Sequence, residues 1–177
     1  MERLCPIVRS KRISSVYDII GDIHGQADRL DSLFKKLRYE KKNGVYQHPE
    51  RSALFLGDLI DRGQQNRDVI KLVRPMVEEG VSKAILGNHE YNAICFHSQH
   101  PETGQPLRRH DDMNKKQHAT FLHEFPVGHP DTFDVIQWFQ SLPLFLDTSE
   151  FRAVHACWDC SAPQGWSTGN VSPAVST

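Results

Sequence analysis

The stretch GDLIDRG, residues 57–63, follows a short apolar run at residues 53–56 and precedes a helical pattern. We expect a strand at 53–56 to deliver Asp58, Asp61 and Arg62 to a loop at the carboxyl end of a sheet, where open α/β folds place their chemistry. Two carboxylates and a guanidinium on one loop are costly to crowd together unless something charged binds there. A metal ion held by carboxylate, beside an anion held by arginine, would use all three.

Three units of the chain share this order of apolar run, polar loop and helical pattern. The runs and loops are 16–20 with GDIHG (21–25), 53–56 with GDLIDRG (57–63), and 83–86 with GNHE (87–90). Strand–helix alternation of this kind favours parallel pairing with right-handed crossovers, so the loops should emerge at one edge of an α/β sheet built from βαβ units. Two later strands are expected at 144–146 and 151–154.

Apolar residues at helical spacing predict a helix after each loop and again later in the chain. The helix after GDLIDRG is expected to take Asn66 as its N-cap and to kink or end early at Pro75. Phe133, Ile136 and Phe139 mark a later helix against the core.

Residues 97–131 are expected to form a polar insertion, broken by proline and glycine, with a polar helix at 112–125. This segment holds six histidines: His97, His100, His110, His118, His123 and His129. They could belong to a lid or supply further metal ligands. A solvated insertion whose histidines face water is the interpretation that we favour.

The length of 177 residues suits one domain with a real core. We expect a flexible N-terminal lead at 1–15, the domain at 16–160 and an unpatterned tail at 161–177. The net charge of -1 provides no bulk field that would recruit nucleic acid or an anionic membrane. The chain has no membrane-length apolar run and no secretory signal, and its four cysteines include only one lone CxxC pair, Cys157 and Cys160. A cytoplasmic protein is therefore expected.

The loops offer metal ligands at four strand ends. Asp22 and His24 should point to the same side because side chains alternate along an extended chain. Asp58 and Asn88 add oxygen ligands, and His155 adds an imidazole after the last expected strand. These are more ligands than one divalent ion usually needs, so two ions bridged by Asp58 would use them economically. Two metals about 3.5–4 Å apart can turn a bridging water into a hydroxide nucleophile near neutral pH and can clamp a phosphoryl group.

Three further residues suit the remaining steps of phosphate hydrolysis. His89 could deliver a proton to the leaving oxygen, and Asp61 is the candidate carboxylate partner that would help to keep it protonated. Arg62 can bind two phosphate oxygens with its forked guanidinium. Glu90, at the start of a helix, is expected to be a structural anion rather than a ligand.

The blocks GDIHG, GDLIDRG and GNHE, in this order at strand ends, resemble the phosphoprotein phosphatase branch of the calcineurin-like metallophosphoesterases. The resemblance runs from about Val16 to Asp159 and implies a dinuclear metal site in a β-sandwich flanked by helices (α/β/β/α layers). By motif position it implies five metal ligands: Asp22 and His24 for one metal, Asn88 and His155 for the other, and Asp58 as the bridge between them. It further implies that His89 with Asp61 is the acid and that Arg62 binds phosphate.

The bacterial members of this branch include protein phosphatases and symmetrical diadenosine tetraphosphatases. The latter commonly have Ala-Arg-Gly in the second block and Asp at the end of the third. Here Asp61-Arg62-Gly63 and Glu90 occupy those places, which favours the phosphoprotein side.

The sequence departs from the family pattern in one respect. The family places another metal-binding histidine well downstream of the position of His155, and this sequence has no histidine after His155. We therefore expect a C-terminally truncated chain in which the last part of the fold is missing and the second metal site is incomplete.

The function expected from these residues is metal-dependent hydrolysis of phosphate monoesters, of phosphoserine, phosphothreonine or phosphotyrosine in proteins. Two alternatives stay open: hydrolysis of a dinucleoside polyphosphate, and an inactive phosphate- or metal-binding module. Oxygen-rich ligation with a few imidazoles suits manganese, with iron or zinc as other candidates. The expected partners are a phosphorylated protein or a small phosphoester, with neither membrane nor nucleic acid.

Overall fold

The computed structural model describes residues 16–157, so the expectations for 1–15, for Cys160 and for 161–177 lie outside the described residues. The elements in chain order are β1 (Tyr17–Ile20), α1 (Ala27–Lys36), β2 (Glu40–Lys42), β3 (Val45–Gln47), β4 (Ser52–Phe55), α2 (Asn66–Glu78), β5 (Ser82–Ala84), α3 (Asn88–His97), α4 (Asp112–Gln117), α5 (Ala119–Glu124), α6 (Pro130–Ser141), β6 (Phe145–Asp147) and β7 (Arg152–Val154). All five predicted strands are present, within two residues of their expected ends.

The central sheet has the strand order β1-β4-β5, and both pairs are parallel, as the sequence predicts. All four residues of β4 are buried because it lies between two strands and is covered on both faces. The carboxyl ends of the three strands therefore point to one edge of the sheet, where the loops GDIHG, GDLIDRG and GNHE begin.

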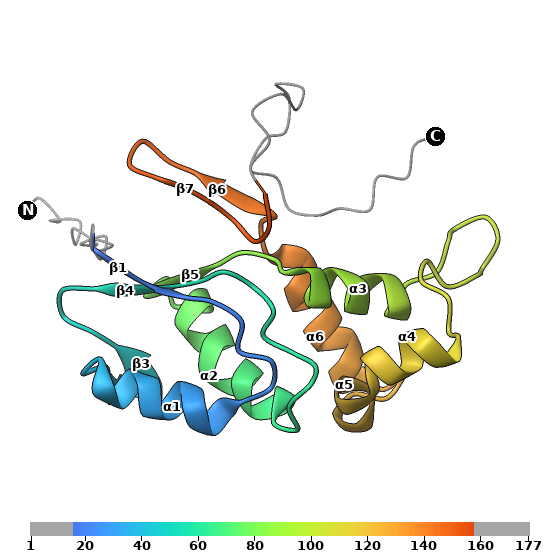
Figure 1. The fold of residues 1–177 in the computed structure, drawn as a ribbon, viewed down its shortest axis with the longest axis horizontal. Helices are drawn as coiled ribbons and strands as arrows, with labels where there is room; N and C mark the ends of the chain where they lie inside the picture. Colours follow the sequence, from blue (N-terminus) through green and yellow to red (C-terminus); the bar gives the residue numbers. More distant parts are fainter. Residues whose placement is uncertain (1–15, 158–177) are drawn as a thin grey trace, which may run out of the picture.

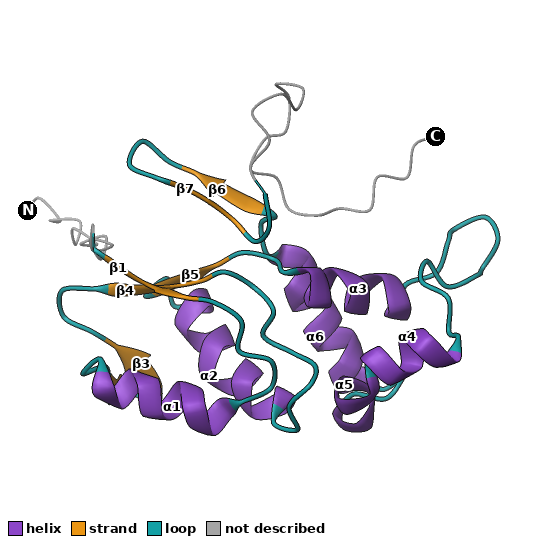
Figure 2. Ribbon diagram, viewed as in Figure 1, coloured by secondary structure: helices purple, strands orange, loops and turns teal. Residues whose placement is uncertain are grey.

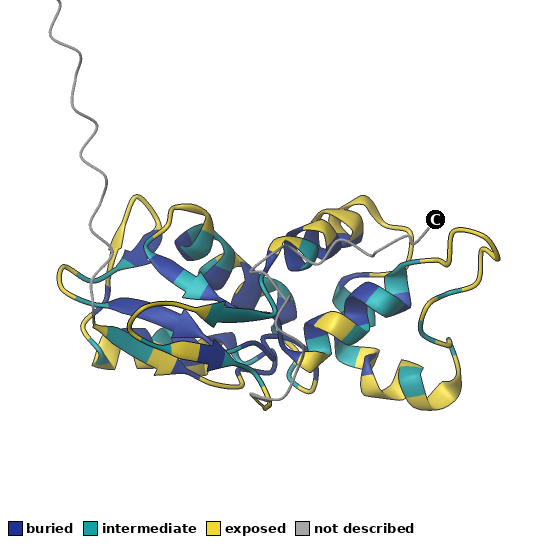
Figure 3. Cartoon of the chain, turned by 90° about the horizontal axis from the view of Figure 1, so that it is seen from above, coloured by how far each residue is buried: buried dark blue, intermediate teal, exposed yellow. Residues whose placement is uncertain are grey.

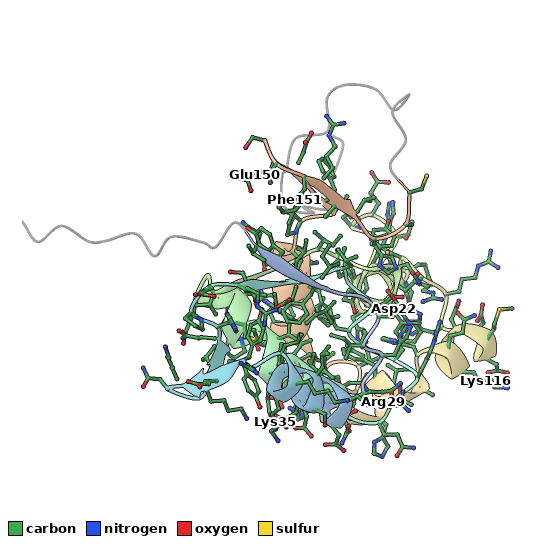
Figure 4. All side chains as sticks on the ribbon, turned by 60° about the vertical axis from the view of Figure 1, so that its left-hand side comes forward. Asp22, Arg29, Lys35, Lys116, Glu150 and Phe151 are labelled. Atoms are coloured by element: carbon green, nitrogen blue, oxygen red, sulfur yellow. The ribbon has the colours of Figure 1, made fainter. Side chains whose placement is uncertain are left out.

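The sheet is covered differently on its two faces. Helices α1 and α2 lie on one face, and the antiparallel hairpin β6–β7 lies over the other (Figure 1; Figure 2). Tyr17 of β1 makes an edge-to-face contact with Phe151 beside β7, with ring centroids 5.1 Å apart, and Figure 4 shows Phe151 directly over β1. The α/β class is confirmed, and within residues 16–157 the second β-layer consists of this hairpin.

The sequence predicts a kink or an early end of α2 at Pro75 and an N-cap at Asn66, and of these the early end and the N-cap are wrong. The helix does not end early at Pro75 but continues to Glu78, and Gly80 follows with the positive φ of 68° typical of a helix end. The N-cap is Gln65, without a side-chain cap. Asn66 is the first helical residue, and its buried side chain accepts a hydrogen bond from the backbone N–H of Asp61 at 2.8 Å. The amide thus supports the preceding loop rather than the helix end.

The segment 97–131 contains two short helices in place of the single helix expected at 112–125. Helix α4 ends at Gln117 and α5 begins at Ala119, with His118 between them. The loop between α3 and α4 is exposed over most of its length (Figure 3). The segment instead buries two aromatic residues, Phe121 in helix α5 and Phe125 directly after it. The segment is therefore only partly solvated.

Helix α6 packs against the core with Val135, Ile136, Trp138 and Phe139, as the apolar spacing predicts, but Phe133 is 66% exposed and faces outward. Among the helices of residues 16–157, none combines the length and the apolar character needed to cross a membrane.

Candidate metal centre

The first two loops are joined by backbone hydrogen bonds at the carboxyl edge of the sheet. Loop GDIHG donates to loop GDLIDRG and receives one bond in return. The bonds run from the N–H groups of Ile23 and His24 to the carbonyl of Asp58 (2.9 Å each), from Gly25 to Leu59 (2.8 Å), and from Gly63 back to His24 (3.0 Å). Because backbone bonds fix backbone positions, the side chains of the two loops are held at a defined separation.

Glu90 joins the second and third loops. Its carboxylate is buried at the start of α3 and accepts the backbone N–H groups of Gly87 (3.0 Å), Asp58 (2.8 Å) and Leu59 (2.8 Å). The structural role predicted for Glu90 fits these contacts. Burial raises the pKa of Glu90 to about 7, and the charge of Asp58 adds to the shift, while the backbone donors oppose it.

The glycines of the motifs let the loops touch. A Cβ on Gly63 would lie 2.4 Å from the carbonyl oxygens of His24 and Gly25, and one on Gly57 would lie 2.3 Å from the backbone nitrogen of Gly87. Four residues other than glycine in these loops also have positive φ: His24, Asp58, Asp61 and Arg62. Such conformations are strained and cluster at functional sites, where the surroundings hold them in place.

The first group of candidate ligands consists of Asp22, His24 and Asp58. His24 Nε2 lies 3.4 Å from Asp22 Oδ2 and 3.9 Å from Asp58 Oδ2. On the other side of the ring, Nδ1 lies 3.0 Å from the carbonyl oxygen of Ile60. A carbonyl only accepts, so Nδ1 carries the proton of the neutral ring and Nε2 presents a lone pair. This Nε2 is buried without a hydrogen-bond partner and faces two carboxylates, an arrangement that a cation satisfies.

The second group consists of Asn88, His155 and, again, Asp58. His155 Nε2 lies 3.0 Å from Asn88 Oδ1 and 3.4 Å from Asp58 Oδ1, while its Nδ1 lies 2.7 Å from the carbonyl oxygen of Leu56. The same reasoning as for His24 leaves Nε2 as an acceptor beside two oxygens. Asp22 lies near this group too, since its carboxylate, that of Asp58 and the ring of His155 place ligand atoms within 4.8 Å of one another. Figure 4 shows Asp22 at the end of β1.

The structure thus brings together all five residues predicted as metal ligands. Asp58 belongs to both groups, with Oδ2 toward His24 and Oδ1 toward His155. Carboxylate oxygens, an amide oxygen and imidazole nitrogens are donors that Mn, Fe and Zn accept. Among the described residues, the donor set fits a pair of divalent ions that share Asp58.

His89 and Asp61 form the predicted pair. His89 Nδ1 lies 2.7 Å from Asp61 Oδ2, and Nε2 faces the metal-ligand side, 4.0 Å from Asp58 Oδ2. The hydrogen bond to Asp61 raises the pKa of His89 above its ordinary value, against the effect of burial. Burial in turn opposes ionisation of Asp61, but hydrogen bonds with His118 and His89 outweigh it and lower the pKa of Asp61.

Arg62 directly follows Asp61 in the second loop. Its side chain is exposed and its φ is 65°. Within residues 16–157 the guanidinium has no ion pair, so it is free to meet an anion arriving from solvent.

His118 is the residue that the sequence reasoning missed. It is fully buried, and its Nδ1 lies 2.8 Å from the second oxygen of Asp61. The interpretation of histidines facing water is therefore wrong for His118, and His97 and His110 are also partly buried, while His100, His123 and His129 are exposed. One signal was available: His118 precedes Phe121 and Phe125 by three and seven residues, which places it on their buried helix face.

Comparison with known proteins identifies a family and several relatives to which this chain is similar. The family profile described as calcineurin-like phosphoesterase matches residues 17–156. A bis(5'-nucleosyl)-tetraphosphatase PrpE [asymmetrical] of Halalkalibacterium halodurans is 49% identical over 74 residues, which are 41% of this chain and 30% of the relative. A symmetrical bis(5'-nucleosyl)-tetraphosphatase of Hamiltonella defensa is 30% identical over 137 residues, which are 77% of this chain and 41% of the relative.

A solved structure shares the fold. The crystal structure of a candidate diadenosine tetraphosphatase superimposes with a TM-score of 0.53 at 18% identity, covering 84% of this chain and 53% of the other. The matched part of this chain spans 30% of the Halalkalibacterium relative and 41% of the Hamiltonella relative. The profile match covers most of the chain, so the chain belongs to the calcineurin-like phosphoesterase family.

Proposed function

We propose that this chain carries the metal-binding loops of a phosphoesterase that hydrolyses phosphoric ester or anhydride bonds with the help of two divalent ions. The observation that carries the proposal is the sharing of Asp58 between two ligand groups, one with His24 and one with His155. When bound, such a metal pair supplies an acidified water molecule and neutralises phosphoryl oxygens.

The side chains of the site divide the remaining work. Asp22, His24, Asp58, Asn88 and His155 would hold the ions. Arg62, which is exposed in the second loop, would orient the phosphate by two hydrogen bonds from its guanidinium. His89 would hold a proton at Nε2 for the leaving oxygen, while Asp61 fixes Nδ1 on the other side of the ring.

The substrate that the relatives favour is a dinucleoside polyphosphate. The similarity to the Halalkalibacterium tetraphosphatase reaches 49% over 74 residues. A phosphorylated protein is the second candidate, because Asp61-Arg62-Gly63 and Glu90 have the form expected on the phosphoprotein side of the family. Manganese is the metal that we propose first, with iron and zinc as alternatives.

The activity is tested with manganese-loaded protein on p-nitrophenyl phosphate, before and after dialysis against a chelator. We expect chelation to abolish turnover and manganese to restore it. Asp58→Asn should lower kcat by about 10²-fold or more, because both ligand groups lose a shared charge. Asp147→Asn, an exposed carboxylate at the end of β6, is the matched control and should leave turnover unchanged. Full activity in chelator would rule the proposal out.

The substrate is tested by side-by-side turnover of diadenosine tetraphosphate and a phosphoserine peptide. Product analysis adds detail, since asymmetrical cleavage gives ATP and AMP while symmetrical cleavage gives two ADP. A kcat/KM higher for the tetraphosphate supports the first candidate, and the reverse order supports the second.

A further inference from the structure

The inference begins at His118, which lies outside the three motif loops. It sits between α4 and α5 and is fully buried. Its Nδ1 lies 2.8 Å from Asp61 Oδ1, across 57 residues of sequence. The contact ties the segment 97–131 to the loop GDLIDRG.

The two oxygens of Asp61 are bonded to two different histidines. Oδ1 accepts from His118 and Oδ2 accepts from His89, at 2.8 and 2.7 Å. Rotation about the last bond of an aspartate side chain is soft, because this torsion has broad preferences. A carboxylate bonded on both oxygens has its plane fixed, whereas one bonded only to His89 would be free to turn with it.

The main chain of Asp61 is held separately. Its N–H donates to Asn66 Oδ1 at 2.8 Å, and its φ is 68°. This support places the Cα but does not set the plane of the carboxylate. Among the described residues, the hydrogen bonds that reach the carboxylate come from His89 and His118.

His118 is itself rigid. Its ring stacks on Phe121 with centroids 4.7 Å apart, and it also contacts the ring of Phe96 at 5.5 Å. Both phenylalanines are buried. Its Nε2 is buried without a hydrogen-bond partner, and its Nδ1 faces the carboxylate, so the Nδ1–H group is the donor to Asp61. The ring therefore acts as a fixed donor behind the carboxylate.

We propose that His118 is a positioning residue that fixes the plane of the Asp61 carboxylate and thereby the orientation of the proton donor His89. The proposal rests on the proposed function, since it assigns His118 a part in the same reaction. His118 does not touch the metal ligands, so its effect should fall on proton delivery rather than on metal binding.

The test uses two variants of the same shape. In His118→Asn the amide nitrogen takes nearly the place of Nδ1 and can donate to Asp61, whereas His118→Leu has the same branching and no donor. With aryl and alkyl phosphates of increasing leaving-group pKa, we expect His118→Leu to lose about 10–100-fold in kcat on the poorest leaving groups and little on dinitrophenyl phosphate. KM should stay near the wild-type value, and His118→Asn should recover most of the loss.

A control separates positioning from packing. His97→Phe alters a neighbouring ring, 5.7 Å from His118, without touching Asp61. It should leave the leaving-group dependence as in the wild type. An equal loss on all leaving groups in His118→Leu, or no difference between the Asn and Leu variants, would overturn the proposal. Should the Leu variant not fold, His118→Gln replaces it, because its amide is displaced by one carbon and should fail where Asn succeeds.

A second measurement does not depend on turnover. The Nδ1–H proton of His89, bonded to a carboxylate, should give a downfield NMR resonance in ¹⁵N-histidine-labelled protein. We expect it to shift or broaden in His118→Leu and to persist in His118→Asn. An unchanged resonance in the Leu variant contradicts the positioning role. Absence of turnover in the wild type would contradict the proposed function alone, since the resonance still reports the contact.

Discussion

The carboxylate of Glu90 accepts the backbone N–H of Asp58 at 2.8 Å, although both side chains are buried acids. The bond brings a second negative group beside the residue that both ligand groups share. The effect of this bond is on the backbone. The same carboxylate also accepts the backbone N–H groups of Gly87 and Leu59, so one side chain sets the spacing of the second and third loops. The geometry of the candidate metal centre therefore depends on a residue that is not one of its predicted ligands.

Replacement of Glu90 by Gln should destabilise the fold. The amide keeps one acceptor oxygen, but its NH₂ group would face backbone donors that now lack a partner. We expect the free energy of unfolding in urea to fall by about 2–3 kcal/mol. Glu102→Gln, at an exposed position, is the control and should change it by less than about 0.5 kcal/mol. Equal stabilities of the two variants would show that Glu90 does not hold the loops.

Gly57→Ala should cost more than Gly104→Ala, although both glycines have positive φ, 88° and 66°. At Gly104 the new methyl group meets nothing within 4 Å, so only the left-handed backbone is penalised, by about 1–2 kcal/mol. At Gly57 the methyl group would collide with the backbone of Gly87, which adds about 1–3 kcal/mol. Denaturant unfolding of both variants gives the comparison, and equal costs would contradict the close packing of the loops.

The sequence was most informative for site residues that directly follow an apolar strand along the chain. Asp58 and Asp61 could be placed at a sheet edge because an apolar run precedes them, and parallel pairing then predicts that the other loops meet them there. The helix after GDLIDRG was located correctly, and of the two outcomes expected at Pro75 the early end is wrong, since tertiary packing overrides the local penalty of one proline.

The contacts from the segment 97–131 could not be predicted in the same way. His118 meets Asp61 across 57 residues, and Glu124 meets Asn66 across 58. No local pattern specifies such pairs, because they depend on where α4 and α5 fold back. The abundance of polar residues favoured the interpretation of a solvated segment, while its buried side was marked only by Phe121 in α5 and Phe125 directly after it.

Glu124 should contribute to stability as a cap for α2. The N-cap Gln65 gives no side-chain hydrogen bond, and the carboxylate of Glu124 instead accepts the N–H groups of Asn66 and Arg67, both at 2.8 Å. We expect Glu124→Ala to lower the free energy of unfolding by about 2 kcal/mol. Glu78→Ala, which removes an exposed ion pair with Arg74, should cost less than about 1 kcal/mol. A loss no larger than that of Glu78→Ala would contradict the capping role.

Stability should fall in mild acid because His97 is held neutral. Burial lowers the pKa of His97 to about 4, and the neighbouring His118 and His110 add to the shift. An unfolded histidine has a pKa near about 6.5, so between these values the unfolded chain binds one more proton than the folded chain. The contribution of His97 is thus fully present above pH about 6.5 and is lost as the pH falls toward about 4, by at most about 1.4 kcal/mol per pH unit.

His97→Phe isolates this effect from the other groups that titrate in the same range. The phenyl ring keeps the aromatic contacts of His97 with Phe96 and Phe121 but cannot take up a proton. We expect the free energy of unfolding to decline less between pH 7.5 and 5 in this variant than in the wild type. His100→Phe, at an exposed position, should keep the wild-type slope. Equal slopes in the wild type and His97→Phe would mean that His97 takes up its proton as readily in the folded chain as in the unfolded one.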